Sequence, residues 1–133
     1  MRKSGRNDIA RSHQDLVVWQ KAMELAGVVY SLAKRFPRSE VYGLTSQTTR
    51  AVVSVATNIA EGDSRGTRKD YAQFLSIAHS SLSETETCLL VAVGVGCLAE
   101  QEIAADFALS TELGKMLTAL RARLLGNSTE KHT

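Results

Sequence analysis

A single proline, at position 37, is the feature that most limits how this chain of 133 residues can fold. Proline breaks helix interiors, and β-rich folds of this size need many turns, which are commonly built with proline and glycine. Hydrophobic residues recur at spacings of three and four on either side of the proline, which is the period of an amphipathic helix. The chain is therefore expected to be all-α, with long uninterrupted helices.

The first expected helix begins at Asp15 and ends at Pro37, because the residue before a proline avoids the helical conformation. Its inward stripe consists of Leu16, Trp19, Met23, Ala26, Tyr30, Ala33 and Phe36. Spacings of three and four place these side chains on one face of the helix. This face is expected to contribute to the core.

A second helix is expected to be capped by Ser39 at its start and by Gly62 at its end. Small apolar residues extend its hydrophobic surface well past a single stripe. A helix that is apolar nearly all round is buried on more than one side, which in a small domain requires a second subunit. The residues expected at this oligomer interface are Val52, Val53, Ala56 and Ala60.

The third helix is expected to begin at Arg68, because Thr67 and Asp70 have the spacing of a capping box. Residues 100–125 form a fourth amphipathic helix. The links between helices are short, which forces neighbours in sequence to pack antiparallel. The expected fold is an antiparallel up-down-up-down four-helix bundle.

The chain is expected to hold one domain. Residues 1–13 lack an apolar period and are expected to form a disordered basic arm, 14–125 the bundle, and 126–133 a disordered tail. The longest apolar run, 88–99, is shorter than the ~20 residues that span a bilayer, and no secretory signal precedes it. We expect a cytoplasmic protein without a membrane partner.

No catalytic or metal-binding arrangement is evident in the sequence. His79 lies among helical serines that point in other directions or sit a turn away, and no glycine-rich elbow accompanies them. Cys88 and Cys97 have the character of buried reduced thiols, without metal-ligand spacing. We therefore expect no enzymatic activity, no catalytic residue, no metal and no cofactor.

Positive charge is concentrated in the first half of the chain. Up to Asp70 there are twelve Lys and Arg against seven Asp and Glu, a balance of +5, and the remainder has a balance of −3. Such a basic half can face phosphate, and an acidic half can face a basic protein. Solvated surface charge is the alternative explanation. The cations proposed to contact nucleic acid are Arg11, Arg50, Arg65, Arg68 and Lys69.

Aromatic residues give little sign of base stacking. They fall on the expected core stripes, and Tyr42 is the one doubtful case. We therefore expect any nucleic acid to be recognised through its backbone and shape.

Asn58, Glu61 and Gly62 end the second helix. The side chains of Asn58 and Glu61 are expected to hold the junction between helices by hydrogen bonds, with Lys21 or Gln47 as partners. A structural role of this kind is favoured over direct contact with a ligand.

Five segments together resemble the four-helix-bundle proteins of the 23S rRNA intervening-sequence type, also called S23 ribosomal proteins. They are DLVVWQKA (15–22), YGLTSQ (42–47), NIAEG (58–62) and the YAQFLSIA and SLSE segments within 71–84. The resemblance implies a homopentamer of antiparallel bundles without enzymatic activity. A related branch, the accessory proteins of diversity-generating retroelements, is implied to bind nucleic acid and a reverse transcriptase.

One departure from the family pattern is visible. Many relatives carry a proline in the second helix where this chain has Val55 and Ala56. Without the kink that a proline causes, this helix is expected to be straighter.

The expected function is that of a non-enzymatic homo-oligomer, of five copies as the resemblance implies, that binds RNA or DNA weakly through repeated basic surfaces. The alternative is a protein-interaction or scaffold module that binds no nucleic acid.

Overall fold

The structure is a computed structural model that describes residues 13–132, and the side chains of residues 17–126. The described part contains four α-helices and two short 3-10 helices. In chain order they are α2 (His13–Ala33), η1 (Arg38–Glu40), α3 (Leu44–Asp63), α4 (Arg68–Gly94), η2 (Glu100–Ile103) and α5 (Ala104–His132).

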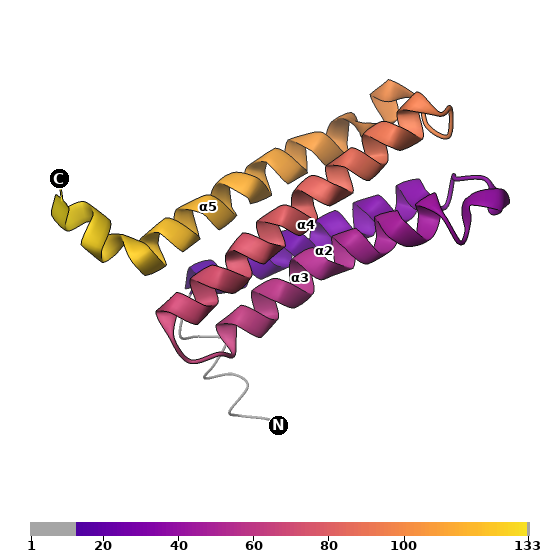
Figure 1. Cartoon of the computed structure of the whole chain (residues 1–133). Coiled ribbons are helices and arrows are strands. Elements are labelled where there is room, and N and C mark those ends of the chain that lie inside the picture. Colours follow the sequence, from indigo (N-terminus) through magenta and orange to yellow (C-terminus); the bar gives the residue numbers. More distant parts are fainter. Residues whose placement is uncertain (1–12, 133) are drawn as a thin grey trace.

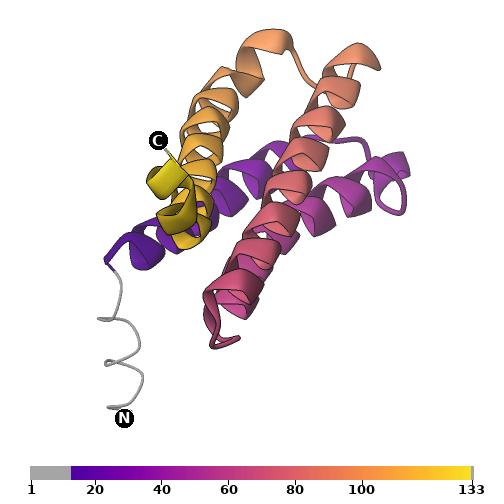
Figure 2. The same cartoon turned by 60° about the vertical axis from the view of Figure 1, so that its left-hand side comes forward.

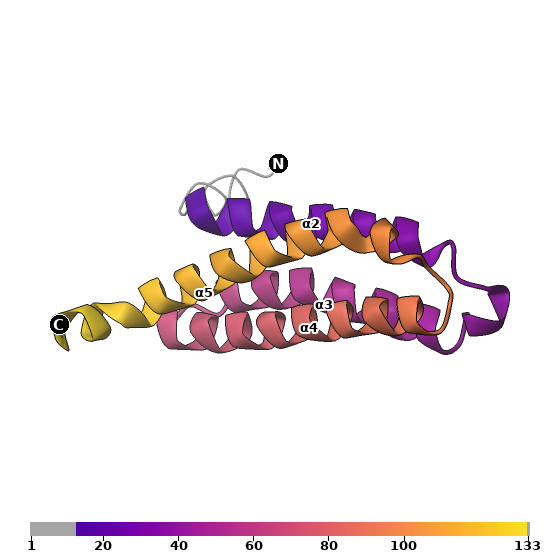
Figure 3. The ribbon, with the colours of Figure 1, turned by 90° about the horizontal axis from the view of Figure 1, so that it is seen from above.

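Helices that follow one another in the chain lie antiparallel and side by side (Figure 1). Seen from above, α3 and α4 form one layer, α2 lies on one side of it, and α5 runs obliquely from beside α2 to the level of α3 and α4 (Figure 3). The 60° view shows α5 next to both α4 and α2, which closes the bundle (Figure 2). The predicted all-α antiparallel arrangement of four helices is confirmed.

Both longer connections lie at one end of the bundle, and the short α3–α4 turn lies at the other (Figure 1). The short turn begins after Asp63 and ends at Thr67. Gly66 in this turn has a φ of 95°, a left-handed conformation that glycine adopts without a steric penalty.

The core lies between the four helices and receives fully buried side chains from each of them. Each buried Leu, Ile or Val side chain stabilises the fold by about 1.5–3 kcal/mol relative to an exposed one. The largest of these apolar side chains are Leu25, Val29, Val52, Val55, Ile59, Leu75, Leu89, Leu113 and Leu117. Apolar burial along the whole bundle therefore holds the helices together.

The predicted inward face of the first helix is wrong at three large residues and right beyond them, where Ala33 and Phe36 are buried. Trp19, Met23 and Tyr30 are all exposed in α2. The face that packs on the core is adjacent to them, and it is the stripe Val18, Ala22, Leu25, Val29 and Leu32. Apolar residues occupy both stripes in this helix, so periodicity alone did not distinguish the buried face from the exposed one.

The predicted start of the second helix is also wrong. Ser39 lies in η1 and makes no capping hydrogen bond there. The helix α3 begins later, after Gly43, and the carboxylate of Glu40 accepts a hydrogen bond from the Leu44 amide at 3.3 Å. The backbone after Pro37 turns through η1 before it becomes helical, and this turn occupies the predicted capping position.

Gly62 does not cap the second helix as predicted. It is buried within α3, and Ser64 occupies the C-cap position. A Cβ atom at Gly62 would lie 2.7 Å from Cβ of Phe74 and 2.9 Å from Cδ1 of Tyr71. The missing side chain therefore allows α3 and α4 to approach each other closely.

The predicted start of the third helix is confirmed, because Thr67 Oγ1 accepts a hydrogen bond from the Asp70 amide at 3.1 Å. The last helix begins and ends later than predicted, because residues 100–103 form η2 and α5 runs from Ala104 through the expected tail as far as His132. The expected basic arm lies, apart from His13 at the start of α2, outside the described residues, and Arg11 lies with it.

Candidate interaction surface

The α3–α4 turn brings three of the predicted nucleic-acid-binding cations together. Arg65 lies in the turn, and its guanidinium is 4.9 Å from the ring centroid of Phe74. Its Nε is also 3.5 Å from Oε2 of Glu61, one helical turn earlier. Arg65 is thus held to α4 by a cation–π contact and to the end of α3 by an exposed ion pair, each of which contributes at most about 1 kcal/mol.

Arg68, the first residue of α4, fastens this turn to α5. Its Nε donates to the Leu124 carbonyl at 3.1 Å, and its Nη2 donates to the Arg123 carbonyl at 3.0 Å. In the reverse direction, Arg121 of α5 donates through Nε to the Ala72 carbonyl at 3.2 Å. Part of the positive charge at the turn therefore has a structural role that the sequence did not reveal.

Lys69 and Arg50 differ from these two arginines. Both side chains are exposed, and neither has an ion pair or side-chain hydrogen bond with another described residue. Arg50 lies on α3, thirteen residues before the end of that helix, which corresponds to a separation of ~20 Å along the axis. The structure thus groups Arg65, Arg68 and Lys69 and leaves Arg50 apart.

Asn58 and Glu61 make local contacts. Asn58 donates through Nδ2 to the Ser54 carbonyl at 2.8 Å and lies 2.9 Å from Ser54 Oγ. Ser54 Oγ is in turn 2.8 Å from Ser81 Oγ on α4. This chain of hydrogen bonds joins α3 to α4, whereas Glu61 pairs with Arg65.

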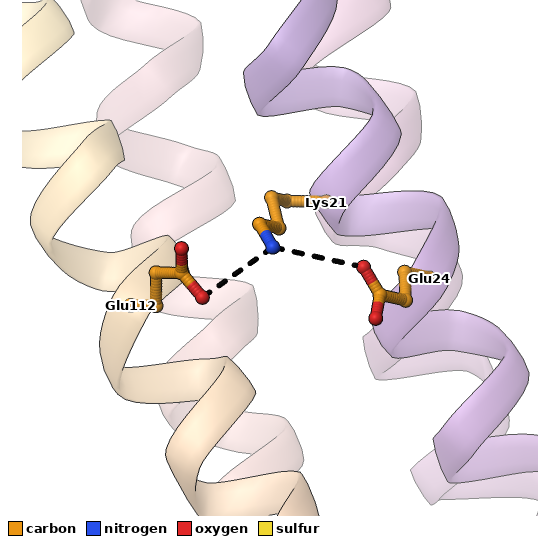
Figure 4. A network of polar contacts seen from close by, with 3 residues as sticks. All are labelled: Lys21, Glu24 and Glu112. Atoms are coloured by element: carbon orange, nitrogen blue, oxygen red, sulfur yellow. Dashed lines mark ion pairs between the residues drawn. The ribbon is translucent and has the colours of Figure 1, made fainter.

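The partners expected for Asn58 were wrong. Lys21 of α2 instead reaches Glu112 of α5, with 3.4 Å between Nζ and Oε1, and Glu24 at 3.8 Å (Figure 4). Gln47 lies at the surface and makes no side-chain hydrogen bond within the described residues.

The four predicted interface residues separate into two pairs. Val52 and Ala56 are buried within the chain itself, so a second copy cannot reach them, whereas Val53 and Ala60 are exposed. We call the exposed surface shared by α3 and α4 the outer face. It consists of Arg50, Val53, Thr57 and Ala60 on α3 and of Gln73, Ile77, Ser80 and Glu84 on α4.

A hollow of about 370 Å³ lies at one end of the outer face. The sequence did not predict this hollow. Tyr42, the aromatic residue that did not clearly belong to a core stripe, was the one indication of it. It is lined by Tyr42, Gly43, Ser46, Gln47, Arg50 and Glu84.

Glu86 of α4 and Asp106 of α5 form an acidic pair inside the bundle. All four carboxyl oxygens are buried, and none has a hydrogen-bond partner of good geometry among the described residues. Burial raises the pKa of Glu86 to about 8, with a further rise from Asp106, while the Ser110 hydroxyl acts in the opposite direction. Burial also raises the pKa of Asp106. Two such carboxyls are expected to hold a proton at neutral pH.

Among residues 13–132, no group of three or more His, Cys, Asp and Glu could hold a metal ion. Both cysteines are free thiols, and Cys88 is buried. No helix in this part of the chain combines the length and the apolar character that a membrane span requires.

The arrangement of the helices places this protein in the class of all-α bundles of four antiparallel helices. The sequence model of the 23S rRNA-intervening sequence protein matches residues 14–119, and the chain belongs to this family.

A crystal structure of a protein with unknown function from the S23 ribosomal protein family of Bacteroides thetaiotaomicron has the same fold, with a TM-score of 0.74. It is 26% identical and covers 81% of this chain and 97% of its own. A comparison with curated protein sequences finds no significant match.

Proposed function

We propose that this protein is a non-enzymatic, self-associating bundle of the cytoplasm that binds the backbone of RNA or DNA. The observation that carries the proposal is the grouping of Arg65, Arg68 and Lys69, all exposed, at the α3–α4 turn. Phosphate groups are the natural partners of such a cluster.

The internal contacts of the arginines are compatible with this role. A guanidinium has five N–H donors, and Arg68 uses two of them for the carbonyls of α5. Because these two bonds hold the side chain in place, less conformational entropy is lost when its remaining donors bind an anion.

One copy of this turn is too small to bind nucleic acid firmly, because each phosphate contact contributes modestly and weakens with salt. Self-association repeats the turn and multiplies the contacts. We propose a closed ring, of five copies by analogy with the family, whose contact is the apolar part of the outer face, Val53 and Ile77, so that the hollow at the end of that face stays open. Exposed apolar residues on that face, Val53 at 40% and Ile77 at 41%, support this choice.

The test is fluorescence polarisation with a labelled RNA hairpin and a DNA duplex at low and moderate salt. We expect binding that weakens with salt and little dependence on sequence. Lys69→Ala is expected to weaken binding. It should also make the plot of the logarithm of the binding constant against the logarithm of the salt concentration less steep, by about one for each phosphate that the variant no longer binds. Lys115→Ala, an exposed lysine on α5, is the matched control and is expected to bind like the wild type. No binding at low salt would contradict the proposal.

A protein-interaction module is the second candidate. The end of α4 exposes three large apolar side chains, Leu90, Val91 and Val95, and the last is 65% exposed. Affinity purification from the native host separates the two candidates. A single stoichiometric protein without nucleic acid would favour the interaction module.

A further inference from the structure

The hollow on the outer face has the volume of a small-molecule site and a lining that is mostly polar. Its volume of about 370 Å³ lies within the ~300–1,000 Å³ of typical ligand pockets. The segment before α3 provides Tyr42, α3 provides Gln47 and Arg50, and α4 provides Glu84. Three parts of the fold thus direct different chemical groups to one place.

The polar groups that line this hollow are not engaged elsewhere. Among the described residues, Gln47, Arg50 and Glu84 make no ion pair and no side-chain hydrogen bond. This distinguishes Arg50 from Arg65 and Arg68, whose guanidinium groups hold the α3–α4 turn. The donors and the acceptor of the hollow are therefore available to a ligand.

Tyr42 adds an aromatic surface beside these polar groups. Its side chain is 95% exposed, so both the ring and the hydroxyl face solvent. An exposed aromatic ring next to an arginine is the combination on which single-stranded nucleic acids stack their bases and place their phosphates. Aromatic stacking had little support in the sequence, and Tyr42, the doubtful case there, is the residue that could provide it here.

We propose that this hollow binds an unpaired guanine nucleotide, which deepens the proposed function and rests on it. Tyr42 stacks on the base, Arg50 binds the phosphate, and the carboxylate of Glu84 accepts hydrogen bonds from the base edge. The choice of guanine follows from Glu84, because a carboxylate only accepts hydrogen bonds.

Guanine has two adjacent donors, N1–H and N2–H, on its Watson–Crick edge. Adenine and cytosine have an amino group next to an acceptor nitrogen, and uracil has one N–H between two carbonyl oxygens. The carboxylate of Glu84 therefore fits the two donors of guanine, whereas the acceptor nitrogen of adenine or cytosine and the carbonyl oxygens of uracil would repel it. The base must be unpaired, because pairing occupies this edge.

The experiment uses the full chain and two labelled RNA hairpins that differ only in one loop base, guanine or adenine. GMP, AMP, CMP and UMP are tested separately by calorimetry, which distinguishes a free nucleotide from a base in a loop. We expect the guanine hairpin to bind at least fivefold more tightly than the adenine hairpin, and GMP to be the preferred mononucleotide.

Variants assign the contacts. Tyr42→Ala is expected to weaken binding of the guanine hairpin by about fivefold or more, since base stacking contributes about 1–3 kcal/mol. Tyr42→Phe keeps the stacking surface and is expected to retain most of the affinity. Glu84→Gln is expected to remove the preference for guanine. Tyr30→Ala and Glu100→Gln change exposed residues outside the hollow and are the matched controls.

Equal affinity for the two hairpins, with Lys69→Ala still weakening both, would overturn the guanine pocket and leave the proposed function intact. GMP binding that Tyr42→Ala weakens, without binding of either hairpin, would support the pocket for a free nucleotide and contradict the proposed function. No binding of any hairpin or nucleotide would overturn both. If Tyr42→Ala changed the molecular mass in light scattering but not the affinity, the hollow would be a contact between copies, and the proposal would be overturned.

Discussion

At the scale of single residues, Gly62 shows how a position without a side chain decides the spacing of two helices. Gly62→Ala would place a methyl group 2.7 Å from Cβ of Phe74, which lies on the facing helix and cannot move without a shift of α4. We expect this variant to lower the free energy of unfolding by about 1–3 kcal/mol, the usual cost of overpacking. Urea denaturation followed by circular dichroism measures the change.

Gly27→Ala is the matched control for this prediction. Gly27 lies within α2, and a Cβ atom there would meet nothing within 4 Å. Because alanine is the better helix former, this variant is expected to gain about 0.5–1 kcal/mol. If both variants destabilised the protein equally, close packing would not be the reason for Gly62.

The carboxyl pair inside the bundle predicts a dependence of stability on pH. The pKa of Glu86 is raised from 4.5 to about 8 in the folded protein, so the native state holds a proton that the unfolded chain releases at lower pH. The stabilisation from this proton is full below pH 4.5 and is lost as the pH rises to about 8. We expect the Tm of the wild type to fall over this interval.

Glu86→Gln cannot ionise, so its Tm is expected to fall less over the same interval, as measured by calorimetry at several pH values. Glu100→Gln alters an exposed acid and is expected to keep the slope of the wild type. If Glu86→Gln also kept that slope, the buried carboxyl would not be the group that titrates.

At the scale of the elements, a comparison of Arg68 with Lys69 separates a structural role from a binding role. Arg68→Ala removes both hydrogen bonds to the α5 carbonyls and is expected to lower the free energy of unfolding by about 1 kcal/mol. Lys69→Ala is expected to change it by less than about 0.5 kcal/mol, because Lys69 is exposed and has no internal partner among the described residues. Thermal denaturation of both variants measures the difference. Equal stabilities would mean that Arg68 does not fasten α4 to α5.

The existence and order of the helices could be predicted because each helix is specified by residues within it or next to it in the sequence. Hydrophobic period, a single proline and the Thr67 cap all act within a few residues of the element they specify. The buried face of α2 before Ala33 could not be predicted, because Trp19 and its neighbour Val18 offer two apolar stripes and only packing against α3 and α5 selects one.

The candidate sites depend on contacts between residues far apart in the sequence and were therefore harder to predict. Arg68 was recognised as a cation at the turn, but its partners in α5 lie more than fifty residues away. The hollow beside Tyr42 requires Glu84 from α4. No local pattern indicates that these residues meet.

At the scale of the whole molecule, the proposed activity depends on repetition of a small surface. A single bundle offers one turn with three exposed cations, and its outer face leaves Val53 and Ile77 in contact with water. Association through that face would bury these side chains and repeat the turn around a ring.

A charged residue on the outer face should oppose association. We expect Ile77→Glu to dissociate the assembly without unfolding the chain, as seen by light scattering and circular dichroism, whereas Met23→Glu on the exposed side of α2 should leave it intact.

The most direct measurement of the central claim is the mass of the wild-type protein in solution by size-exclusion chromatography with light scattering. The account predicts a single species with a multiple of the 14.4 kDa chain mass, five chains by analogy with the family. A homogeneous species of 14.4 kDa across a wide range of protein concentrations would contradict it.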